Sequence, residues 1–110
     1  MTSDQTTTNR LRDQARTIFQ AGIDAADPAR AVAAVLSCRD GQPVFSPHPL
    51  SPNAQEKPRE GQWKRVFILS FGKAAIAMAQ AAAEIIPNNL LQTPGIIVTN
   101  YENADVSIPG

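Results

Sequence analysis

The sequence has too few cysteines and histidines to build the common cross-links of small proteins. It contains one cysteine, Cys38, and one histidine, His48, in 110 residues. These counts exclude an internal disulfide and a structural zinc site made from several Cys and His ligands. A chain without disulfides suits a reducing compartment, so we expect a cytoplasmic protein.

A strong charge of either sign is also missing. Ten basic side chains balance ten acidic ones, so the formal net charge is zero. This balance provides no field to attract nucleic acid or an anionic membrane. No apolar run approaches the roughly 20 residues that span a bilayer, and the N-terminus lacks the apolar segment of a signal peptide. We therefore expect a soluble protein that binds neither nucleic acid nor membrane.

The N-terminal part predicts an amphipathic helix. Residues 1–9 are polar and rich in threonine, and we expect them to be disordered, with the helix beginning near Asn9 or Arg10. Apolar residues then recur at three- and four-residue steps on one face: Leu11, Ala15, Ile18, Phe19, Gly22, Ile23 and Ala26. This spacing predicts a helix that docks through that face.

A second helix follows at once. In "ADPARAVAAVL", Asp27 is a candidate N-cap and Pro28 suits the first helical position. Val32, Val35 and Leu36 form its apolar stripe. Cys38 would lie at the end of this helix, where we expect a buried, unreactive thiol.

Residues 39–62 carry turn and loop signals. The Asp-Gly pair in "RDGQPVF" predicts a turn that leads into a short strand around Val44 and Phe45. The following "SPHPLSPNAQEKPREGQ" contains four prolines and predicts an exposed loop. His48 lies between two of these prolines with nothing nearby to orient it, so we expect a solvated residue rather than a catalytic base.

The strongest pattern is a strand, a helix and a second strand. "RVFILS" (65–70) and "GIIVTN" (95–100) are apolar runs of strand formers, separated by an alanine-rich helix of about fourteen residues that Pro87 ends. This order predicts a βαβ unit with parallel strands covered on both faces. We therefore predict an α/β fold, a three-layer α/β/α domain with a parallel sheet (Rossmann-like), in which a helix pair precedes the βαβ unit. A two-stranded parallel sheet cannot cover its own faces, so we expect the domain to be incomplete.

The junction between the first of these strands and the helix is the candidate site. It comprises Ser70, Gly72, Lys73 and Ala74 at the carboxyl edge of the predicted sheet, where α/β proteins bind ligands. Gly72 allows a tight turn, and the helix start offers unpaired N–H groups to an anion. Lys73 costs about 0.3–1 kcal/mol beside the positive end of the helix dipole unless an anion offsets it. We predict that a carboxylate or phosphate binds here.

Plainer interpretations of the same residues stay open. Lys73 could be a solvated surface charge, Gly72 could serve only the turn, and Ser70 could satisfy local backbone groups. The junction matches neither the P-loop, because Phe67 and Ala74 replace its Gly and its Ser or Thr, nor the G-x-G-x-x-G dinucleotide pattern.

Two polar residues after the second strand, Asn100 and Tyr101, would open on the same edge. We expect them to line the cleft, with an ordinary polar strand exit as the alternative. No metal ligands are predicted in this chain.

Three segments together resemble the N-terminal part of the glycerate 2-kinases that carry a C-terminal MOFRL domain, a family also described as hydroxypyruvate reductases. The matching segments are "IFQAGIDAADPARAV" (18–32), "RVFILSFGKAAIAMAQA" (65–81) and "GIIVTNYENA" (95–104). The resemblance implies ATP- and Mg²⁺-dependent phosphorylation of the 2-hydroxyl of D-glycerate to give 2-phosphoglycerate. It also implies that Lys73 is the catalytic residue, contacting the substrate or the transferring phosphate.

The chain departs from the family pattern at two places. Members commonly read Gly-Ala-Gly-Lys-Ala at the junction, where this chain has Ser70-Phe71-Gly72-Lys73-Ala74. Members often read Thr-Lys-Tyr-Gly-His after the second strand, where this chain has Thr99-Asn100-Tyr101-Glu102-Asn103, so no role of that lysine or histidine carries over.

Residues 10–110 would then form the N-terminal portion of the family's first α/β domain, in truncated form. Family members are several times longer, so we expect this chain alone to be inactive. The alternatives are a hydroxypyruvate reductase and a non-catalytic module that needs a partner. The sequence leaves homo-oligomerisation open.

Overall fold

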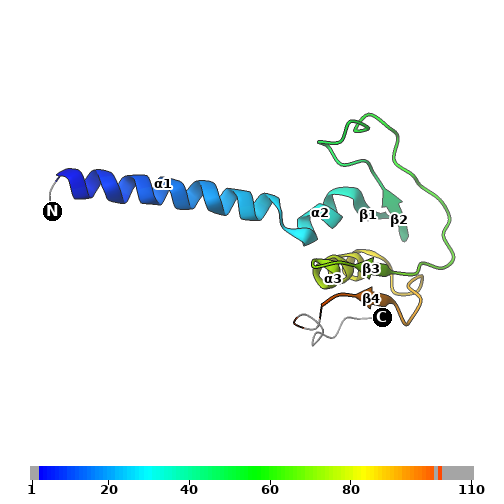
Figure 1. The fold of residues 1–110 in the computed structure, drawn as a ribbon. Coiled ribbons are helices and arrows are strands. Elements are labelled where there is room, and N and C mark those ends of the chain that lie inside the picture. The colour runs from blue at the N-terminus through cyan, green and yellow to red at the C-terminus, as the bar shows by residue number, and fades with distance from the viewer. Residues whose placement is uncertain (1–2, 101, 103–110) are drawn as a thin grey trace.

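The structure is a computed structural model that describes residues 3–100 and 102. One long helix, α1 (Ser3–Ala25), projects from a compact part that contains all the other elements (Figure 1). The molecule therefore extends over 66 × 38 × 22 Å.

Helix α1 begins at Ser3, whereas the sequence predicts disorder up to residue 9. The polar start is compatible with a helix because the Thr7 and Thr8 hydroxyls donate to the carbonyls of Ser3 (3.0 Å) and Asp4 (2.9 Å) one turn earlier. The amphipathic pattern is confirmed as helical, but no residue of α1 is buried. The predicted docking face is therefore uncovered.

Helix α2 (Pro28–Val35) follows after Ala26 and Asp27. Asp27 is its N-cap as predicted, and its Oδ1 accepts the Ala29 N–H at 3.2 Å. The helix ends at Val35, so Cys38 lies in a strand, β1 (Leu36–Arg39), and not at a helix end. The Cys38 thiol is exposed, which makes the prediction of a buried thiol wrong.

Strand β1 pairs antiparallel with β2 (Gln42–Phe45). Asp40 and Gly41 form the predicted turn, both with positive φ (52° and 74°). Residues 36–39 form a strand and do not extend α2, because the hairpin buries Leu36 and Val44 and pairs the backbone of both strands. The predicted strand around Val44 and Phe45 is confirmed.

The predicted βαβ unit is present. Strand β3 (Leu69–Phe71) lies parallel to β4 (Ile96–Val98), and α3 (Ala75–Ile85) connects them. Both strands are shorter than predicted, although an isolated parallel bridge between Val66 and Leu91 extends the pairing. Helix α3 ends before Pro87.

The core lies on one side of this parallel pair. It is a cluster of buried side chains from α2, β1, α3 and the turn after α3: Val32, Leu36, Ala81, Ile86 and Leu90. Val66 and Ile68, before β3, pack against it. Helix α3 therefore packs on the inner face of the parallel sheet, and α2 packs on α3 and β1.

The opposite face of the parallel sheet is uncovered, and we call it the open face. It consists of five large apolar side chains that are 58% to 74% exposed: Phe67, Leu69, Phe71, Ile96 and Val98. Alternation along the strand separates them from the inward Val66 and Ile68.

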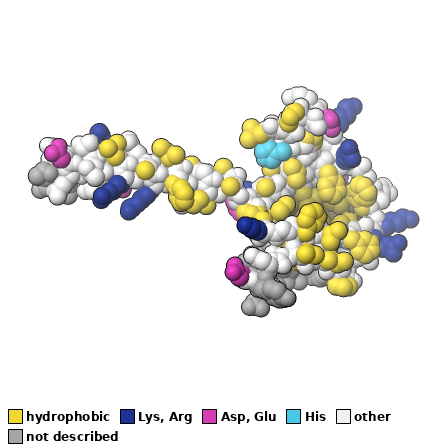
Figure 2. Space-filling model, in the orientation of Figure 1, with side chains coloured by type: hydrophobic (Ala, Val, Ile, Leu, Met, Phe, Trp, Pro, Cys, Tyr) yellow, Lys and Arg dark blue, Asp and Glu magenta, His cyan; other side chains and the backbone are white. Residues whose placement is uncertain are grey.

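The described residues give a mixed α/β fold with one parallel and one antiparallel two-stranded sheet, without the predicted second helical layer. Figure 2 shows hydrophobic side chains spaced along the projecting helix and gathered on the compact part.

Within the described part of the chain, no helix combines the length and hydrophobicity that a membrane span requires.

Candidate functional site

The junction between β3 and α3 is built by a backbone turn at Gly72. Its N–H donates to the Val98 carbonyl at 2.9 Å, and its carbonyl accepts the Ala75 N–H at 3.2 Å. Gly72 has φ +106°, a conformation that L side chains rarely adopt, yet a Cβ here would meet no atom within 4 Å. Glycine is therefore required by the backbone angle, and the space in front of the turn is open.

The Ser70 side chain supports the turn. Its hydroxyl donates to the Ala75 carbonyl at 2.8 Å in a half-buried position. This bond ties the end of β3 to the first turn of α3 and occupies the only proton of the hydroxyl. Of the two roles considered for Ser70, the structure shows the local backbone role, although the oxygen can still accept a hydrogen bond.

Lys73 lies in the turn just before α3 and is exposed. Ala74, the N-cap residue, makes no side-chain capping bond to the first turn of the helix. In the part of the chain that the structure describes, no carboxylate forms an ion pair with Lys73. The positive helix end and the lysine charge are thus uncompensated by the described residues, which suits an anion.

One residue at this edge, Thr99, is not among the site residues predicted from the sequence. Thr99 directly follows β4, and the pairing of Phe71 with Val98 places it beside Gly72. Its Oγ1 is buried and has no hydrogen-bond partner among the residues that the structure describes. A buried hydroxyl without a partner costs about 1–3 kcal/mol, so this oxygen is a candidate contact for a ligand group. The signal in the sequence was its position, one residue before the predicted Asn100.

The structure places the other candidate residues, Asn100, Tyr101 and His48, in different settings. Asn100 is exposed and follows Thr99 at the same edge of the sheet, so its role in lining a cleft stays a prediction. Tyr101 lies outside the described residues. His48, expected to be a solvated loop residue with nothing to orient it, is half-buried and accepts the Leu50 N–H on Nδ1 at 3.1 Å, a bond within its own loop.

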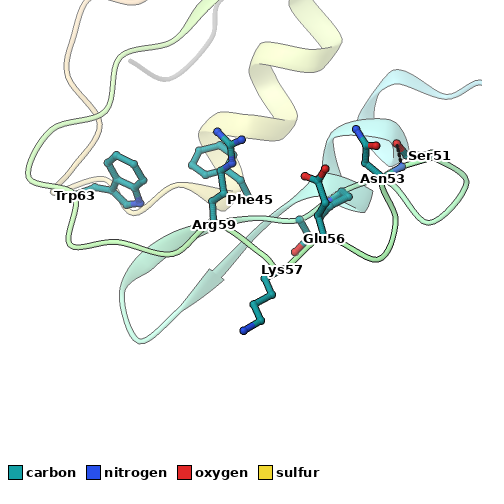
Figure 3. A pocket seen from close by; sticks show the side chains of 9 residues that line it. Phe45, Ser51, Asn53, Glu56, Lys57, Arg59 and Trp63 are labelled. Carbon is teal, nitrogen blue, oxygen red and sulfur yellow. Dashed lines mark hydrogen bonds between the residues drawn. The ribbon is translucent and has the colours of Figure 1, made fainter.

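A separate hollow of about 510 Å³ lies between the hairpin and the proline-rich loop (Figure 3). Phe45 and Trp63 stand edge to face with ring centroids 6.2 Å apart. In Figure 3, Arg59 and Glu56 extend on one side of the loop, whereas Lys57 points the other way. None of the predicted site residues lines this hollow, and no pattern in the sequence predicts it.

The described residues suit one of the implied ligands, the phosphate groups of ATP, better than the other, Mg²⁺. The β3–α3 junction offers the cation and backbone N–H groups that suit a phosphate or carboxylate. Among residues 3–100 and 102, no group of three or more His, Cys, Asp or Glu could hold a metal ion. The described residues therefore fit an anion but do not supply a ligand set for Mg²⁺.

Comparison with known proteins gives one match. No curated protein and no solved structure matches this chain. A family model described as Domain of unknown function (DUF4147) matches residues 14–108. The match covers most of the chain, including the second half of α1, all of α2, the βαβ unit and the Gly72–Lys73 turn. The chain therefore belongs to the DUF4147 family.

Proposed function

We propose that this chain is the N-terminal part of a glycerate 2-kinase of the MOFRL class, and that it contributes an anion-binding turn to the active-site cleft. Family membership supports this, because the matching domain is typical of the N-terminal part of glycerate kinase and MOFRL-family proteins. The observation that carries the proposal is the exposed Lys73 beside a helix end without a side-chain cap.

In the proposed reaction, the 2-hydroxyl oxygen of D-glycerate bonds to the γ-phosphorus of ATP. The bond from that phosphorus to the bridging oxygen breaks, ADP leaves, and the hydroxyl proton passes to a base. Negative charge on the substrate carboxylate and on the three phosphoryl oxygens must be stabilised throughout.

Lys73 and the first N–H groups of α3 suit that requirement. The lysine ammonium provides a full charge, and the fixed backbone dipoles need no reorganisation as charge develops. Gly72 keeps the approach to these groups free of a side chain. Thr99 would donate its hydroxyl proton to the same anion, which would satisfy the buried oxygen.

The test is a coupled assay of ADP release with D-glycerate, ATP and Mg²⁺ on the complete gene product. We expect Lys73→Gln to lower kcat by about 10²–10³-fold, because one electrostatic contact to the transition state is lost. Lys64→Gln is the matched control, since Lys64 is also exposed but lies before β3. Wild-type turnover with an unchanged rate in Lys73→Gln would refute the role of the lysine.

A second assay distinguishes the kinase from the alternative enzyme, a hydroxypyruvate reductase. A hydroxypyruvate reductase would oxidise NADH or NADPH in the presence of hydroxypyruvate and would not need ATP. Reductase activity without ADP release would replace the kinase proposal. If neither activity is present, the third alternative applies, a non-catalytic module that needs a partner. Two exposed apolar surfaces favour that alternative: the apolar face of α1 and the open face of the parallel sheet.

A further inference from the structure

The hollow between the hairpin and the proline-rich loop contains residues to which the proposed kinase reaction gives no role. All its lining residues lie within positions 45–63, and its volume of about 510 Å³ is in the roughly 300–1,000 Å³ range of small-molecule pockets. Phe45 and Trp63 form an apolar wall in it. Their rings contact each other, yet 41% and 40% of their surfaces stay exposed and can contact a ligand.

The backbone fixes the segment that carries this wall to the hairpin. Phe45 and Arg59 exchange two backbone hydrogen bonds, of 3.0 and 2.7 Å. Residues paired in this antiparallel way have their side chains on the same side, so Arg59 lies beside the Phe45 ring. An ion pair of 2.6 Å between Arg39 and Glu60 joins β1 to the same segment.

Trp63 is held by two further contacts. Its backbone N–H donates to Gln42 Oε1 at 2.8 Å. Its ring lies so close to Gly61 that a Cβ added there would come within 3.3 Å of the ring. The wall is therefore in place before a ligand arrives, which lowers the entropic cost of binding.

Two opposite charges lie at this hollow. Arg59 and Glu56 extend on the same side of the loop, whereas Lys57 points the other way (Figure 3). Within residues 3–100 and 102, neither the Arg59 guanidinium nor the Glu56 carboxylate forms an ion pair. A ligand in the hollow would thus meet one cation and one anion together with the aromatic wall.

This combination selects among the possible occupants. An apolar protein segment would remove both charges from water without giving either a partner, which is costly. A simple anion would bind Arg59 but be repelled by Glu56. A zwitterion satisfies both charges, because a carboxylate pairs with the guanidinium and an ammonium group pairs with Glu56. A ring on the same ligand would contact Phe45 and Trp63.

We propose that this hollow binds a free α-amino acid with an aromatic side chain. Its carboxylate lies on Arg59, its ammonium group on Glu56, and its ring against the Phe45–Trp63 wall. D-Glycerate has neither an ammonium group nor an apolar side chain, so the site is distinct from the proposed substrate site. The proposal does not depend on the proposed kinase activity.

The chain contains its own reporter, because Trp63 is its only tryptophan. We expect titration of the 110-residue chain with L-phenylalanine to change the Trp63 fluorescence saturably, with Kd on the order of 0.1–1 mM. Three analogues each lack one recognised group: phenylacetate the ammonium, phenethylamine the carboxylate and L-alanine the ring. Each should bind about 10-fold more weakly or worse.

Charge variants show which group each residue binds. Arg59→Gln should weaken L-phenylalanine about 10-fold and leave phenethylamine unchanged, because phenethylamine has no carboxylate to lose a partner. Glu56→Gln should weaken L-phenylalanine similarly without weakening phenylacetate. Lys57→Gln is the matched control and should bind L-phenylalanine as the wild type does. Circular dichroism checks that all three variants fold.

Three results would overturn the proposal. The first is the absence of a saturable change with L-phenylalanine. The second is equal binding of all analogues, or equal loss in all three variants, which would indicate adsorption to the aromatic wall. The third comes from equilibrium dialysis of the complete gene product with labelled L-phenylalanine. Binding to the 110-residue chain but not to the complete gene product would show that another part of the protein fills the hollow.

Discussion

At the scale of single residues, the β3–α3 junction illustrates how one backbone angle positions several groups. Gly72 turns the chain so that Ser70 bonds to Ala75, Lys73 precedes the helix, and Thr99 lies alongside. The identities of Gly72 and Lys73 could be recognised in the sequence because glycine and a charged residue at a strand-to-helix step are unusual. The orphaned Thr99 hydroxyl could not, since burial of one atom depends on how the two strands pair.

Replacing Gly72 by alanine tests the turn. The added methyl meets open space, so any effect comes from forcing an L residue to φ +106°. We expect the free energy of unfolding to fall by about 1–3 kcal/mol, measured by urea denaturation. Gly22→Ala is the control, because the same methyl is added in a helix with nothing within 4 Å, and it should not destabilise. Equal effects of both changes would contradict the role of the backbone angle.

Asp27 offers a second test at this scale. Removing its carboxylate by Asp27→Ala leaves the Ala29 N–H without its capping partner. The expected loss is about 0.5–2 kcal/mol in the free energy of unfolding. Asp27→Asn keeps the side-chain oxygen and should remain within a few tenths of a kcal/mol of the wild type. A large loss in the asparagine variant would point to the charge instead of the cap.

At the scale of elements, local signals and tertiary packing compete most visibly at residues 36–39. The periodicity extends α2 through Leu36, but the structure starts β1 there. Leu36 has 7% of its surface exposed and belongs to the core cluster, so burial together with pairing to β2 decides its conformation. Helix propensity alone is too weak to resist that gain.

Truncating Leu36 to alanine measures how much burial of its side chain stabilises the fold. We expect Leu36→Ala to lower the free energy of unfolding by about 2–4 kcal/mol through lost burial and the cavity it leaves. Leu50→Ala makes the same chemical change at a side chain that is 88% exposed, and it should change stability by less than about 0.5 kcal/mol. Thermal or urea unfolding of both variants provides the comparison, and equal midpoints would show that Leu36 is not a core residue.

At the scale of the whole molecule, the chain divides into a compact part and a projecting helix (Figure 1). The compact part has its own buried cluster, whereas α1 contributes no buried residue. A helix in water gains most of its stability from packing of an apolar face, so α1 on its own should open readily. Its persistence then depends on what covers that face.

Hydrogen exchange followed by mass spectrometry tests this dependence. In dilute protein, amides of α1 should exchange much faster than those of α3, which is anchored by buried Ala75, Ala79 and Ala83. Equally slow exchange in both helices would contradict the expectation that α1 opens readily.

The sequence by itself determined the βαβ unit, the Asp27 cap, the Asp-Gly hairpin turn and the position of Lys73 before a helix. Each depends on neighbouring residues in the chain, through periodicity, capping or turn geometry. The tertiary structure alone decided that no residue of α1 is buried, that residues 36–39 form a strand, and that one sheet face is open. It also decided that the Thr99 hydroxyl is buried. These features depend on which distant surfaces meet, and local sequence patterns carry no information about that.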